Sequence, residues 1–120
     1  GQSMRYKIGV KLPKVLDSRM FVALDAIERA WINNTQAIDA PFEPTITSWA
    51  DSTHGPGSYH KRDGRAVDVR TKGLPLRTAI RFVDEVRKRI GALGFDVIHE
   101  HVGLEQEHAH IELDSRADEA

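Results

Sequence analysis

The sequence contains no cysteine, which excludes disulfide bonds, thiolate metal sites and cysteine nucleophiles. It also lacks a strong charge of either sign, because 17 lysines and arginines stand against 18 aspartates and glutamates. Such a balance creates no field that would attract nucleic acid or an anionic membrane. No apolar run approaches the roughly 18 residues that a membrane helix needs. We therefore expect neither a nucleic-acid nor a membrane partner.

The composition is that of an ordinary globular domain, with 40% hydrophobic and 29% charged residues among 120. This length corresponds to one domain with one core. Residues 1–3 resemble a tag remnant ahead of Met4, and residues 115–120 form a polar tail, so we expect the domain to span 4–114. No secretory signal is visible after Met4, and the localisation stays open.

The spacing of apolar residues predicts an α+β domain. Apolar residues recur at helical spacing over 17–33 and 75–90, which predicts two main helices. Alternating or β-branched stretches predict five strands, at 4–10, 45–49, 66–70, 95–99 and 109–113. This order of elements favours helices packed against one face of a mostly antiparallel sheet.

An aspartate interrupts one of the expected strands, within the stretch SYHKRDGRAVDVR at 58–70. In a strand that packs against a core, a position between two valines would ordinarily be apolar. Because side chains alternate along a strand, Val67 and Val69 can face the core while Asp68 faces a cleft. The carboxylate then lies on a surface where it is available for chemistry.

The last expected strand, HAHIEL, divides in the same way. His108, His110 and Glu112 share one face, and the apolar residues between them share the other. A catalytic zinc site takes three protein ligands of the histidine and carboxylate type and leaves one position to water. His60, Asp68 and His110 would supply such a set. Spacing alone does not distinguish this site from a solvated, histidine-rich surface.

Two motifs together resemble a known family. The first places Ser58, His60, Gly64, Ala66 and Asp68 in the order found in zinc D-alanyl-D-alanine carboxypeptidases and dipeptidases of the VanX type. Their relatives include phage L-alanyl-D-glutamate endopeptidases and the Hedgehog signalling domain. The second motif is an acidic residue, two further residues and then a histidine that opens an apolar strand, often continued by a glutamate. Here Glu107, His110 and Glu112 hold these positions within EHAHIE at 107–112. The spacer after the first histidine is one residue longer than the commonest family spacing.

The resemblance, which covers about 45–114, implies a zinc peptidase with the small α+β domain of the Hedgehog and DD-peptidase proteins. It implies that His60, Asp68 and His110 bind Zn²⁺. It also implies that Glu107 is the general base, with Glu100 and then Glu105 as alternatives.

Further residues are candidates for substrate contact or for support of the metal ligands. His108 resembles the first histidine of the His-x-His pairs in the phage and Hedgehog branches, and it would line the site. His54 and Ser58 are candidates from the preceding loop, although His54 could equally bond to the backbone of a turn. Many relatives carry an upstream arginine that this chain lacks, and Arg65 or Arg70 could replace it. His99 and His101 are expected to be exposed.

We therefore expect a monomeric hydrolase that cleaves an amide bond in the stem peptides of peptidoglycan, next to a D-amino acid. The small size suggests a phage or prophage lytic enzyme, of the endolysin or carboxypeptidase kind, made in the cytoplasm and acting on the cell wall. The alternative is an inactive module of the same fold that binds zinc and the cell wall.

Overall fold

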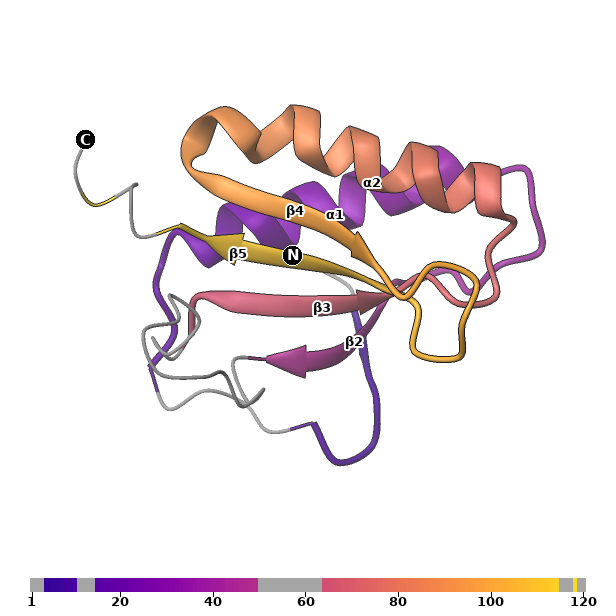
Figure 1. Ribbon diagram of the computed structural model, residues 1–120, viewed down its shortest axis with the longest axis horizontal. Helices are drawn as coiled ribbons and strands as arrows, with labels where there is room; N and C mark the ends of the chain where they lie inside the picture. The colour runs from indigo at the N-terminus through magenta and orange to yellow at the C-terminus, as the bar shows by residue number, and fades with distance from the viewer. Residues whose placement is uncertain (1–3, 11–14, 50–63, 115–117, 119–120) are drawn as a thin grey trace.

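Two helices and five strands follow one another in the order that the sequence predicts (Figure 1). The structure is a computed structural model, and it describes residues 4–10, 15–49, 64–114 and 118. The elements are β1 (Arg5–Tyr6), α1 (Met20–Thr35), β2 (Thr45–Trp49), β3 (Ala66–Arg70), α2 (Leu76–Ile90), a short 3₁₀ helix (Gly91–Leu93), β4 (Phe95–Glu100) and β5 (His108–Leu113). They form a small α+β domain.

The five strands form one mixed sheet in the order β1-β2-β3-β5-β4. Only β1 and β2 are parallel, so the sheet is mostly antiparallel, as predicted. The first strand is much shorter than the expected 4–10. It ends after Tyr6 because the chain turns at Ile8 and Gly9, where the φ angle of Gly9 is 89°.

Helix α1 begins three residues later than predicted because Asp17 holds a turn ahead of it. The Asp17 carboxylate accepts hydrogen bonds from the backbone N–H and the guanidinium of Arg19. The hydrogen bonds with Arg19 lower the pKa of Asp17 to about 2. Arg65 pairs with Asp17 and with Asp118, which ties the start of β3 to the turn ahead of α1 and to a residue near the C-terminus. Arg65 therefore forms its ion pairs with carboxylates other than that of Asp68.

Both helices cover the same face of the sheet, and the core lies between the two layers (Figure 1). The apolar faces of β3, β4 and β5 meet the helices there, and Trp31 of α1 packs edge-to-face on Phe82 of α2 at 5.5 Å. Val67, Val69 and Ile111 are among the most deeply buried side chains. Neither of the helices described has the length and hydrophobicity required to span a bilayer.

Truncation of a core strand residue should cost far more stability than the same truncation on the opposite face. Ile111 of β5 is 0% exposed and Ile98 of β4 is 47% exposed. Ile111→Ala should therefore lower the free energy of unfolding by about 2–5 kcal/mol, because it removes buried contacts and leaves a cavity. The matched control Ile98→Ala should cost much less. Urea denaturation of both variants measures the difference, and equal losses would contradict the assignment of faces.

Candidate metal centre

The pairing of β3 with β5 brings Asp68 and His110 together. In this antiparallel pair Asp68 lies directly opposite His110. Because Val67 and Ile111 point toward the helices, the carboxylate and the imidazole extend from the other face of the sheet. The distance between Asp68 Oδ1 and His110 Nδ1 is 2.6 Å. Two of the three side chains predicted to bind metal are therefore neighbours.

Glu112 holds the other side of the His110 ring. His110 Nε2 lies 2.9 Å from Glu112 Oε1, and both side chains are buried. Histidines that bind metal commonly donate their second N–H to a carboxylate, which fixes the ring and its tautomer. Glu112 has this relation to His110. Sequence reasoning placed Glu112 on the correct face but gave it no role, although the alternation in HAHIEL carried the signal.

The carboxylates around His110 determine its protonation. Burial would lower the pKa of His110, but the hydrogen bond with Asp68 and the charges of Asp68, Glu100 and Asp96 outweigh it, so the pKa is raised. In the metal-free protein an imidazolium can donate to Asp68 through Nδ1 and to Glu112 through Nε2. A cation that binds at Nδ1 must displace that proton, and metal affinity should weaken as the pH falls.

His108 connects Glu100 to this pair. Its Nδ1 lies 2.6 Å from the backbone oxygen of Gln106, which can only accept a hydrogen bond, so Nδ1 carries a proton. Its Nε2 then faces Glu100 Oε1 at 3.0 Å and Asp68 Oδ2 at 3.8 Å. His108 therefore lies beside Asp68, and Glu100 lies within hydrogen-bond distance of His108.

Glu107 is held inside the β4–β5 connection. Its Oε2 is 2.9 Å from His99 Nε2, and its Oε1 accepts the backbone N–H of Gly103 at 3.0 Å. Burial alone would raise the pKa of Glu107, but the bonds from Gly103, Thr71 and His99 together lower it. The motif implies that Glu107 is the general base, but both of its carboxylate oxygens form hydrogen bonds with residues other than Asp68.

The expectation that His99 is exposed is wrong. Its side chain is 12% exposed, because β4 alternation points it to the same side as the buried Val97, and Glu107 packs against it. His101 is exposed, as expected, and has a positive φ of 52°.

A groove of about 250 Å³ opens beside Asp68 and His108. Its walls come from β2, β3, the segment after β1 and the connection that leads into β5. Besides Asp68 and His108, the residues around it are Lys7, Thr47, Ser48, Arg70, Glu105, Gln106 and Glu107. Arg70 was a candidate for substrate contact, and it lies at this groove as one of two cationic side chains.

The remaining predicted residues His54, Ser58 and His60 lie outside the described residues. Within 4–10, 15–49, 64–114 and 118, no three histidine or acidic side chains converge as a metal site requires. Asp68 and His110 are nevertheless donors of the type that zinc takes, and Glu112 supplies the supporting carboxylate. The described part of the site fits zinc as two ligands of a set whose third member would be His60.

No protein-family model matches the chain, and neither curated proteins nor solved structures gave a match. Support for a function therefore comes from the two sequence motifs and from the contacts of their side chains.

The network around Glu107 predicts a pH-dependent contribution to stability. Because its pKa is lowered in the folded protein, ionised Glu107 stabilises the fold above its usual pKa, and this is lost as the pH falls through the folded value. Glu107→Gln should lower the unfolding free energy by about 1–3 kcal/mol near neutral pH and by less near pH 3. Urea denaturation at both pH values measures this.

Glu105→Gln is the matched control, because Glu105 is an exposed carboxylate in the same connection. It should change stability little at either pH. A loss for Glu107→Gln that is the same at both pH values would show that its charge does not stabilise the fold.

Proposed function

We propose that the chain is a zinc-dependent peptidase that hydrolyses an amide bond in peptidoglycan stem peptides, next to a D-amino acid. The observation that carries the proposal is the close contact between Asp68 and His110. Glu112 lies within hydrogen-bond distance of the His110 ring, and a groove opens beside Asp68. A buried imidazole between two carboxylates, beside an open groove, is the donor arrangement expected at a zinc site with access for a substrate. A phage or prophage origin, with action on the cell wall, belongs to the same proposal.

The specific fold is part of this proposal. The two motifs that resemble those of the Hedgehog and DD-peptidase proteins reach separate strands in this chain, with Asp68 on β3 and His110 on β5. Here the motif strands β3 and β5 are neighbours, and both helices lie on the opposite face. This arrangement supports membership of that group and leaves the ligand face accessible from the side without helices.

The chain's own groups have distinct tasks in such a site. His60, Asp68 and His110 would hold the metal, and Glu112 would keep the His110 ring oriented. When bound, zinc would supply Lewis acidity that polarises the scissile carbonyl and lowers the pKa of the attacking water. Arg70 at the groove would favour the negative charge that develops on the carbonyl oxygen.

The contacts favour Glu100 over Glu107 as the general base. Glu100 touches His108 Nε2 at 3.0 Å, its side chain is 41% exposed, and it can reach water. Glu107 is bonded through both oxygens inside the hairpin, and its lowered pKa makes it a weaker proton acceptor. Glu107 remains the alternative, because its place in the motif is that of the family's base and it borders the groove.

A second candidate function is an inactive module that binds zinc and the cell wall. The engagement of both Glu107 oxygens favours it, because this carboxylate would have to leave two partners before acting as a base. Incubation with purified peptidoglycan separates the two functions. Release of new amino groups indicates an enzyme, whereas zinc-dependent retention without release indicates a binding module.

Metal binding should depend on the residues of the pair in a graded way. Wild-type protein should bind about one zinc ion per chain, measured by elemental analysis after dialysis. His110→Ala and Asp68→Asn should abolish stoichiometric binding, and Glu112→Gln should weaken it about 10–100-fold because it removes the support of His110. His101→Asn, an exposed histidine in a position that asparagine tolerates, should bind zinc normally. A wild-type protein without stoichiometric divalent metal would refute the proposal.

Paired glutamate variants identify the base. Glu100→Gln should keep zinc and lower amine release from peptidoglycan by about 10²–10⁴-fold, because the attacking water loses its proton acceptor. Glu105→Gln should retain activity. If Glu107→Gln instead abolished activity while it remained folded and bound to zinc, and Glu100→Gln were active, Glu107 would be the base, as the motif implies.

A further inference from the structure

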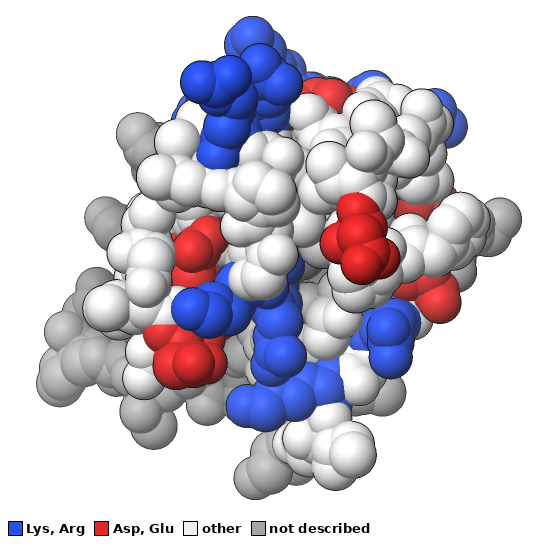
Figure 2. Space-filling model, turned by 90° about the vertical axis from the view of Figure 1, so that its right-hand side faces the viewer, with Lys and Arg blue, Asp and Glu red and all other residues white. Residues whose placement is uncertain are grey.

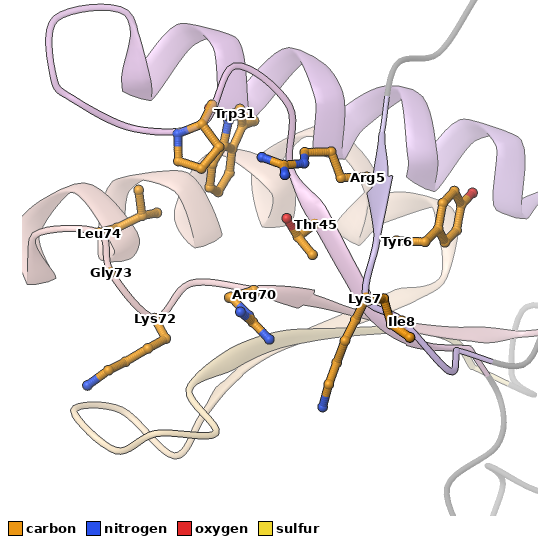
Figure 3. A pocket seen from close by; sticks show the side chains of 11 residues that line it. Arg5, Tyr6, Lys7, Ile8, Trp31, Thr45, Arg70, Lys72, Gly73 and Leu74 are labelled. Carbon is orange, nitrogen blue, oxygen red and sulfur yellow. Dashed lines mark hydrogen bonds between the residues drawn. The ribbon is translucent and has the colours of Figure 1, made fainter.

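A second and larger cavity lies next to the groove, at the end of the sheet where β3 leads into α2. Its volume is about 480 Å³, within the range typical of small-molecule sites. It is formed by the residues of β1, the start of β2, the end of β3 and the turn before α2 (Figure 3), and Trp31 and Pro41 also line it. None of its lining residues belongs to either predicted motif, although Arg70 follows Asp68 by two residues.

Four cationic side chains surround this cavity, and among the residues that the structure describes no acidic side chain lines it. They are Arg5, Lys7, Arg70 and Lys72. In the close view Arg70 lies between Lys7 and Lys72, and Arg5 extends toward Trp31 (Figure 3). Figure 2 looks onto this end of the molecule and shows a band of Lys and Arg side chains in the lower half of the face, with Asp and Glu side chains on either side of it and another Lys and Arg group at the top.

These four cations differ in their partners from five other arginines of the protein. Arg19, Arg29, Arg65, Arg87 and Arg89 each form an ion pair with a carboxylate. Across the described ranges, none of the four cations at the cavity has such a pair. A concave site lined by charges of one sign concentrates their field and attracts a counter-ion.

The uncharged residues that line the cavity limit the kind of ligand that it can bind. Trp31 is buried, and its indole N–H already donates to the backbone oxygen of Pro41 at 2.9 Å, so it offers only apolar surface. Leu74 and Pro41 add to that surface, and Thr45 adds a hydroxyl. Two arginines offer planar forks that suit phosphate and carboxylate groups, and four positive charges exceed what a single carboxylate would neutralise.

We propose that this cavity binds an anionic group with at least two negative charges, such as a phosphate or two neighbouring carboxylates. The site is distinct from the candidate metal centre, although Lys7 and Arg70 border both cavities. A ligand bound there can extend into the groove beside Asp68. The proposal does not depend on peptidase activity or on zinc, so either one can fail without the other.

Titration with small anions tests the proposal. Inorganic phosphate, glutarate and acetate are added at constant ionic strength and slightly alkaline pH, to protein freed of metal by chelation and to protein as purified. Chemical shifts of backbone amides report the site. Phosphate or glutarate should shift residues 5–8 and 70–74 and bind at least about tenfold more tightly than acetate, because each added charge-assisted contact strengthens binding. The tighter of the two identifies the ligand as phosphate-like or dicarboxylate-like.

A pair of double variants with the same change in charge gives the control. Arg5→Ala with Lys72→Ala should weaken binding of the dianion at least about tenfold. Arg81→Ala with Lys88→Ala, which removes two exposed cations of α2, should leave it within about twofold. Asp68→Asn should keep anion binding even where it abolishes zinc binding. Equal weakening by both double variants, equal affinity for acetate, or shifts confined to the region of His110 would overturn the proposal.

Discussion

The register of β3 against β5 is the constraint on which the rest of the site depends. It places Asp68 opposite His110 and Val67 opposite Ile111, so one alignment fixes both the polar pair and the core contacts. A shift of β3 by one residue would turn Asp68 toward the helices and away from His110, and it would expose Val67 and Val69. Burial of Val67, Val69 and Ile111 therefore holds Asp68 opposite His110, so the packing that stabilises the sheet also positions this polar pair.

The connection between β4 and β5 contains a buried carboxylate, that of Glu107. Glu107 is 7% exposed, and an ionised carboxylate so placed needs partners. The backbone N–H of Gly103 and the side chain of His99 supply them, which closes the connection on itself directly before β5 begins. Both oxygens of Glu107 are therefore bonded within the connection, whereas Glu100 at the end of β4 keeps a side chain that is 41% exposed beside His108.

Strand alternation made much of this arrangement predictable. The opposed faces of β3 and β5 follow from sequence, because Val67 and Val69 flank Asp68 and the apolar residues of HAHIEL interleave with its histidines. Alternation with Val97 also gave the face of His99, although we expected that side chain to be exposed. Its contact with Glu107 was not predictable, since Glu107 lies eight residues later in a connection without periodicity. The cationic cavity escaped prediction for the same reason. Arg5, Lys7, Arg70 and Lys72 come from two distant segments that only the mixed sheet brings together.

Lys7 and Arg70 give the two cavities a shared wall, and this has an electrostatic consequence. On one side they face a cavity that no acidic side chain of the described ranges lines, and on the other they lie near Asp68 and the acidic connection that leads into β5. The potential therefore changes sign across these two side chains over a short distance. An extended ligand with an anionic group would be oriented by that gradient, with its charge toward Arg5 and Lys72 and its uncharged part toward Asp68 and His108. A peptide that carries a carboxylate or phosphate at one end and an amide bond further along has this distribution of charge.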